Sequence, residues 1–149
     1  MRPDLRQSLA MTAEAAAQAR DPWWIIGSAA VALHGAEVPD IKDVDLLMMA
    51  LDAERILHHL GVESCPPTYS TLFRSSVFGT WSAPPLPVEI MGDLRLSTPA
   101  GWRPVRPETR VAVTVEGKRL FVPAAAELIA LLRSFGRPKD LMRIRLLEA

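Results

Sequence analysis

Two aspartates, Asp43 and Asp45, begin the clearest strand pattern in the chain, an apolar run that continues to Met49. In a strand, residues i and i+2 project from the same face, with their backbones roughly 6 to 7 Å apart. Two carboxylates on one face repel each other unless a positive charge lies between them. Mg²⁺ suits such a place, since one or two carboxylates and substrate phosphates commonly hold it. An isolated Asp-x-Asp pair, however, more often caps the solvated start of a strand.

A second feature lies earlier in the chain, where the apolar run 23–26 is followed at once by Gly27-Ser28 and a helix of small residues over 28–34. Glycine lets a phosphate approach the backbone closely, and the serine hydroxyl and the free amides of a helix start can face an anion. Many strand-to-helix turns use Gly-Ser only for packing. The Gly-Ser turn therefore indicates a phosphate site only in combination with the two aspartates.

The remaining pattern predicts an α/β (α+β) fold, with a mixed sheet flanked by helices in a single domain over 1–149. We expect an N-terminal helix over 4–20, a core over 22–122 and C-terminal helices over 123–148. Asp52 is interpreted as the N-cap of a helix that ends at Leu60. Further strands are predicted at 72–81, at 87–91 within an otherwise irregular proline-rich segment 83–107, and in a hairpin at 111–115 and 119–122.

Composition excludes several classes of protein. Seventeen basic and seventeen acidic side chains cancel, so the chain has no general attraction to nucleic-acid backbones. Its single cysteine, Cys65, rules out an intramolecular disulfide framework and favours a reducing, cytoplasmic setting. No apolar run approaches the roughly 18 residues that cross a bilayer, so no membrane partner is expected.

Gly27-Ser28 followed by Lys42-Asp43-Val44-Asp45-Leu46-Leu47 resembles the nucleotidyltransferase superfamily that includes DNA polymerase β. The sequence is most similar to the minimal and antibiotic-type members. Near the C-terminus, 128–131 and 136–141 (Gly-Arg-Pro-Lys-Asp-Leu) look like the closing helices of the AbiEii-like branch. These short motifs are distributed over most of the chain.

The resemblance implies transfer of a nucleoside monophosphate from a nucleoside triphosphate to an unidentified acceptor. Gly27 and Ser28 would hold the triphosphate, and Asp43 and Asp45 would bind Mg²⁺ or Mn²⁺. A third catalytic and metal-binding carboxylate is expected on a later strand. Glu89 is the candidate, because it is the only acid in its region with strand-like apolar neighbours; the alternative is an ordinary glutamate on a strand edge.

Arg137 and Lys139 lie at the start of the last predicted helix, where two cations could make a second contact with the nucleotide phosphates. They could instead be solvated residues beside Asp140, whose charge suits a helix start. The resemblance favours Lys139 as a phosphate ligand.

Four positions depart from the pattern of the superfamily: Pro39, Ile41, Leu132 and Arg143. Two alternatives therefore stand beside an enzyme, namely a toxin–antitoxin component that acts through a partner protein and a degenerate nucleotide-binding module. The acceptor could be a small hydroxylated molecule, a tRNA end or a protein. A homodimer that completes the site is also left open.

Overall fold

A computed structural model describes residues 1–65 and 70–149 of the chain. Its central sheet has the strand order β1-β2-β5-β4, formed by Trp24–Ile26, Val44–Met48, Val88–Gly92 and Val77–Trp81. β2 runs parallel to β5, whereas β1 and β4 are antiparallel to their neighbours. The predicted mixed sheet is confirmed.

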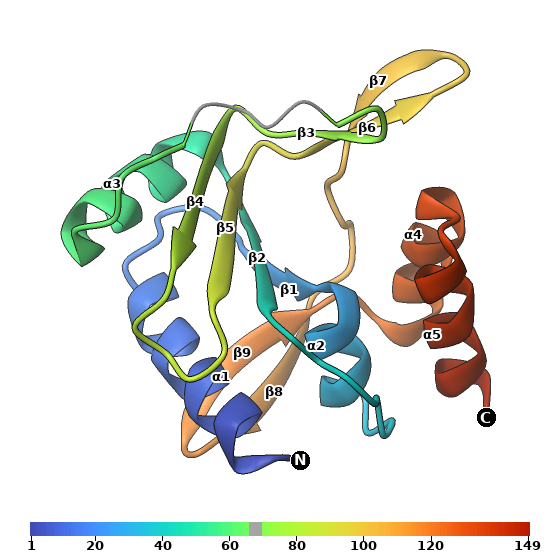
Figure 1. Cartoon of the computed structure of the whole chain (residues 1–149), viewed down its shortest axis with the longest axis horizontal. Coiled ribbons are helices and arrows are strands. Elements are labelled where there is room, and N and C mark those ends of the chain that lie inside the picture. Colours follow the sequence, from blue (N-terminus) through green and yellow to red (C-terminus); the bar gives the residue numbers. More distant parts are fainter. Residues whose placement is uncertain (66–69) are drawn as a thin grey trace.

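Helices pack around this sheet, and their bounds are α1 Pro3–Ala16, α2 Gly27–Leu33, α3 Ala50–Leu60, α4 Ala125–Phe135 and α5 Pro138–Glu148. α3 packs on β4 and β5, and α1 packs on β2. α4 and α5 pack on each other and on α2, at the opposite side of the molecule from α3 in the view of Figure 1. None of the helices within the described residues combines the length and apolar character needed to cross a membrane.

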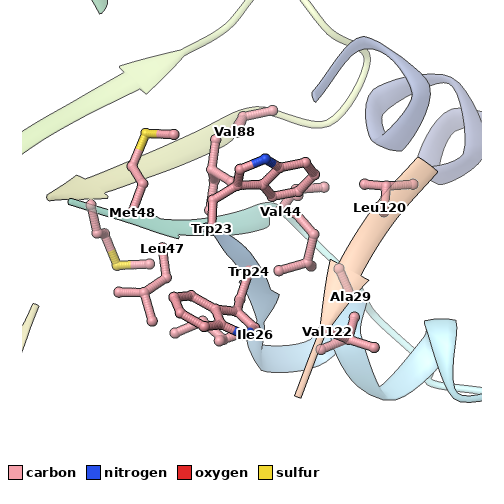
Figure 2. Packing of buried hydrophobic residues seen from close by; sticks show 14 of the residues in the cluster. Trp23, Trp24, Ile26, Ala29, Val44, Leu47, Met48, Val88, Leu120 and Val122 are labelled. Carbon is pink, nitrogen blue, oxygen red and sulfur yellow. The ribbon is translucent and has the colours of Figure 1, made fainter. Parts of the chain in front are cut away.

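The core is centred on β2, where Val44 and Leu46 are fully buried (Figure 2). Trp23 contacts the ring of Phe121 edge-on, with ring centroids 5.3 Å apart. Trp24 is also buried, and its Nε1 donates to the Thr109 carbonyl over 2.9 Å. Phe121 belongs to the predicted hairpin, which forms as β8 (Val111–Val115) and β9 (Lys118–Val122).

The proline-rich segment is more regular than predicted. The run 72–81, which precedes this segment and was predicted as a strand, divides into β3 (Phe73–Arg74) and β4, which belong to different sheets. β6 (Arg95–Thr98) and β7 (Gly101–Pro104) then form an antiparallel hairpin that pairs with β3. Proline disfavours a central strand because it lacks an N–H, but β7 lies at the edge of its sheet and tolerates Pro104.

The predicted end of the first helix and the predicted start of the helix that ends at Leu60 were wrong. The first helix ends at Ala16 rather than residue 20. α3 begins at Ala50, whose N–H bonds the Asp93 carboxylate over 3.0 Å, so Asp52 is not the N-cap. Asp52 is instead buried inside the first turn and accepts the backbone N–H groups of Arg20 and Asp21 over 3.1 and 2.9 Å. These two hydrogen bonds attach the segment between α1 and β1 to α3.

Candidate active site

Asp43, Asp45 and Glu89 come together at one end of the central sheet. Asp45 on β2 lies directly between Ile26 of β1 and Glu89 of β5 in the strand register. Asp43 immediately precedes β2. Carboxylate oxygens of the three acids lie within 4.8 Å of one another, and all three residues are partly buried. We call this group the acidic trio.

Burial and mutual repulsion favour the protonated forms of two acids of the trio. Burial, followed by the charges of Asp43 and Glu89, raises the pKa of Asp45 to about 8. Burial and the charge of Asp43 also raise the pKa of Glu89, although a hydrogen bond with Asp45 and the charge of Lys139 oppose this. A divalent cation would relieve this repulsion, and the oxygen donors suit Mg²⁺ or Mn²⁺.

The Gly27–Ser28 turn lies against this trio. Gly27 has a φ of 69°, which favours glycine, and a β-carbon there would lie 2.5 Å from Oδ2 of Asp45. Any larger residue would displace the carboxylate. The side chain of Ser28 is 5% exposed and faces a cavity that Asp43 also lines. The Gly27-Ser28 motif and the Asp43/Asp45 motif, which are separated in the sequence, are therefore adjacent in the structure.

The cavity beside Ser28 and Asp43 has a volume of about 300 Å³, and its cationic side chains are Lys42, Lys139 and Arg143. We call it the cationic cavity. Lys139 and Arg143 are four residues apart on α5, so they share one face of that helix. The charge of Lys139 acts on Glu89, and that of Arg143 acts on Asp45.

Sequence reasoning missed Lys42 and Arg143 as members of this cavity. The resemblance marked Arg143 only as a departure from the family pattern. Its four-residue spacing from Lys139 on the last helix is the signal that could have identified it. An additional cation at this position adds positive charge to the cavity lining.

Arg137 and Lys139, predicted together, lie in different places. Arg137 donates from Nε to Asp140 over 2.7 Å and from Nη2 over 3.1 Å, and Asp140 is completely buried. The guanidinium of Arg137 also lies 5.0 Å from the centre of the Phe73 ring. It lines a second cavity of about 260 Å³, on which Gly27, Asp45 and Glu89 also border.

No protein-family model matches the sequence, and no curated protein matches it. Several solved structures do match it. A Thermotoga maritima protein described as a nucleotidyltransferase matches with a TM-score of 0.79 at 22% sequence identity, covering 97% of this chain and 92% of its own. A lincosamide antibiotic adenylyltransferase, solved with lincomycin bound, matches with a TM-score of 0.62 at 12% identity over 95% of each chain.

This chain has the nucleotidyltransferase fold. A third similar structure is the antibiotic-resistance factor ANT(2'')-Ia in complex with adenylyl-2''-tobramycin, with a TM-score of 0.59 at 12% identity over 98% of this chain and 88% of its own. The fold that the resemblance implies is thus confirmed. The AbiEii-like part of the resemblance stays a prediction.

Within the nucleotidyltransferase fold, the four departures have different consequences. Ile41 and Leu132 are core residues, 5% and 0% exposed, so they support the packing around the site rather than its polar surface. Pro39 and Arg143 both line the cationic cavity. Of the four departures, Pro39 therefore adds an apolar residue to the cavity lining and Arg143 adds a cation, whereas Ile41 and Leu132 belong to the core.

Proposed function

We propose that this protein is a metal-dependent nucleotidyltransferase that transfers a nucleoside monophosphate from a nucleoside triphosphate to a hydroxyl acceptor. The observation that carries the proposal is the acidic trio, three carboxylates within 4.8 Å, lying against the Gly27–Ser28 turn. The nucleotidyltransferase fold of the chain agrees with this assignment.

Asp43, Asp45 and Glu89 are the proposed metal ligands. They offer hard oxygen donors whose mutual repulsion a divalent cation would relieve. When bound, Mg²⁺ or Mn²⁺ would neutralise negative charge on the phosphates and orient them.

The cationic cavity is the proposed place of the triphosphate. Ser28, which lines this cavity, would offer its hydroxyl. Gly27 is not on this lining, and the absence of its side chain leaves room for the carboxylate of Asp45. Lys139 and Arg143 would add positive charge from α5. Arg137, whose guanidinium is oriented by Asp140, lines the second cavity and not the cationic cavity, so we assign it no contact with the triphosphate.

Glu89 is the proposed general base. Its carboxylate belongs to the acidic trio and also borders the second cavity, so it can face an acceptor hydroxyl held there. It would take the proton of the acceptor hydroxyl, whose oxygen then attacks the α-phosphorus as pyrophosphate leaves. Asp43 and Asp45 would keep the triphosphate beside this oxygen.

The proposal is tested with α-labelled ATP, GTP, CTP and UTP and a cell extract as the source of acceptors. We expect the wild type to transfer label in the presence of Mg²⁺ or Mn²⁺, and Asp43→Ala to lose transfer. Asp21→Asn is the control, because Asp21 has an exposed side chain and is not part of the acidic trio. Metal-dependent nucleotide binding without transfer would favour a degenerate binding module. Equal behaviour of wild type and Asp43→Ala would contradict the proposal.

A further inference from the structure

The second cavity next to the acidic trio has a chemical character different from that of the cationic cavity. Its walls are mainly apolar and include three phenylalanine rings and three aliphatic or thioether side chains, from Ile26, Phe73, Phe78, Met91, Leu94 and Phe135. We call it the aromatic cavity. Its volume of about 260 Å³ lies just below the range of about 300 to 1,000 Å³ typical of pockets for drug-sized ligands. Its occupant must therefore be compact.

The aromatic wall is held by specific contacts. Phe73 of β3 and the buried Phe135 of α4 meet edge-to-face, with ring centroids 4.9 Å apart and an interplanar angle of 83°. The guanidinium of Arg137 also lies over Phe73 and is tied to Asp140 by two hydrogen bonds. Residues from β3 and the C-terminal helices therefore hold an aromatic wall beside the acidic trio, and such a wall suits an apolar ring.

The charges at the cavity argue against a cationic occupant. Asp45 and Glu89 are the carboxylates among its described lining residues, and both belong to the proposed metal site. The cations on the lining are Arg74 and Arg137. A molecule with several ammonium groups would meet two like charges and would compete with the metal for the two carboxylates.

We propose that the aromatic cavity binds the acceptor, and that the acceptor is a compact, uncharged, ring-bearing molecule with a hydroxyl directed at Glu89. This inference rests on the proposed function, because it names the substrate class for the same site. The cationic cavity borders Asp43 and the aromatic cavity borders Asp45 and Glu89, so both cavities reach the acidic trio, as donor and acceptor pockets of one reaction would.

The reaction with such an acceptor balances as one displacement. The acceptor oxygen forms a bond to the α-phosphorus of the nucleoside triphosphate, and the bond from that phosphorus to the β-bridging oxygen breaks. The hydroxyl proton passes to Glu89, and pyrophosphate carries away the bonding electrons of the leaving oxygen. The products are a nucleoside monophosphate ester of the acceptor and pyrophosphate.

The test uses 2-naphthol as a probe acceptor and neamine as a polycationic probe. Binding of each to the full chain is measured by ligand-observed NMR with Mg²⁺ and α,β-methylene-ATP, which cannot release pyrophosphate. We expect 2-naphthol to bind and neamine not to displace it. Ser75→Phe places a ring on the lining and should weaken 2-naphthol binding by about tenfold or more. Ser76→Phe is the matched control, because Ser76 is exposed and absent from that lining.

A further variant keeps the test valid if Ser75→Phe does not fold. Phe78→Ala removes one partly exposed ring from the cavity wall, and it too should weaken 2-naphthol binding several-fold. Circular dichroism and binding of α,β-methylene-ATP verify that each variant is folded. Retained nucleotide binding with lost 2-naphthol binding supports the inference.

The possible failures are distinguishable. If α,β-methylene-ATP binds normally but 2-naphthol does not bind, or binds equally well to the folded cavity variants, the inference is overturned and the proposed function stands. Displacement of 2-naphthol by neamine overturns it in the same way. If α,β-methylene-ATP itself does not bind to the wild type with metal, both the proposed function and the inference fail.

Discussion

Gly27 lies so close to Asp45 that a β-carbon on residue 27 would be 2.5 Å from the Asp45 Oδ2 atom. The first residue of α2 and the carboxylate on β2 thus pack so closely that no side chain fits between them. This contact joins the two motifs that the sequence places in separate elements.

Gly27→Ala should therefore damage both stability and metal-dependent nucleotide binding. The φ of 69° strains any side chain by about 1 to 3 kcal/mol, and the new methyl group also displaces Asp45. Gly35→Ala is the control, since Gly35 has a φ of 94° but no atom within 4 Å of its added β-carbon. Urea unfolding and ATP titration should show that Gly35→Ala loses stability alone. Normal ATP affinity in Gly27→Ala would contradict the close contact.

The stability of the metal-free protein should fall as the pH rises. Burial is the main cause that raises the pKa of Asp45 from 3.8 to about 8, so over this interval the folded state binds more protons than the unfolded chain. The corresponding stabilisation is complete below pH 3.8 and is lost as the pH rises through about 8. Urea unfolding in EDTA at pH 5.5 and pH 8 measures this loss.

Asp45→Asn is the variant that isolates this effect, because it removes the titrating group. Its stability should change less between the two pH values than that of the wild type, and saturating Mg²⁺ should reduce the wild-type loss. An identical pH dependence in the wild type and Asp45→Asn would show that a group other than Asp45 causes the loss.

Asp52 should be a large contributor to stability, although it lies outside the active site. Burial tends to raise its pKa, but the N–H groups of Arg20 and Asp21 and the charge of Arg55 outweigh burial and hold the pKa below its ordinary value. Asp52→Ala leaves both N–H groups without their partner and should cost about 2 to 4 kcal/mol. Arg55→Ala removes a partly exposed partner and should cost less than about 1 kcal/mol. Equal losses in urea unfolding would refute this ranking.

Lys139→Ala should weaken triphosphate binding more than monophosphate binding. Lys139 lines the cationic cavity, where the β- and γ-phosphates are proposed to lie. We expect the ATP affinity to fall by about tenfold and the AMP affinity to change little. Arg145→Ala provides the comparison, because Arg145 is an exposed cation on the same helix and is absent from the cavity lining. Equal effects of the two variants on ATP would indicate only a general loss of positive charge.

The sequence was informative where a local pattern determines the structure. Alternation along a strand is sufficient to place Asp43 beside Asp45, and the apolar neighbours of Glu89 are sufficient to put it on a strand. The superfamily resemblance supplied the expectation that a third carboxylate, from a later strand, joins the first two. The structure brings all three acids together, as the sequence predicted.

Prediction from the sequence failed where a contact between distant residues determines the structure. An aspartate near a helix start looks the same whether it caps the helix or, like Asp52, bonds a segment about thirty residues earlier. β6 and β7 were missed because a proline-rich run favours irregular structure, and the pairing partner in β3 is not apparent locally. Arg143 was interpreted as a departure from the superfamily pattern, and the packing of α5 shows that it lines the cationic cavity together with Lys139.

The central claim is that the acidic trio holds a divalent metal together with a nucleotide. Electron paramagnetic resonance of free Mn²⁺ tests it directly in the wild type and in Asp45→Asn. We predict that the wild type depletes the free Mn²⁺ signal, that α,β-methylene-ATP increases this depletion, and that Asp45→Asn abolishes both effects. Equal depletion by the two proteins, or none by either in the presence of the nucleotide, would contradict the claim.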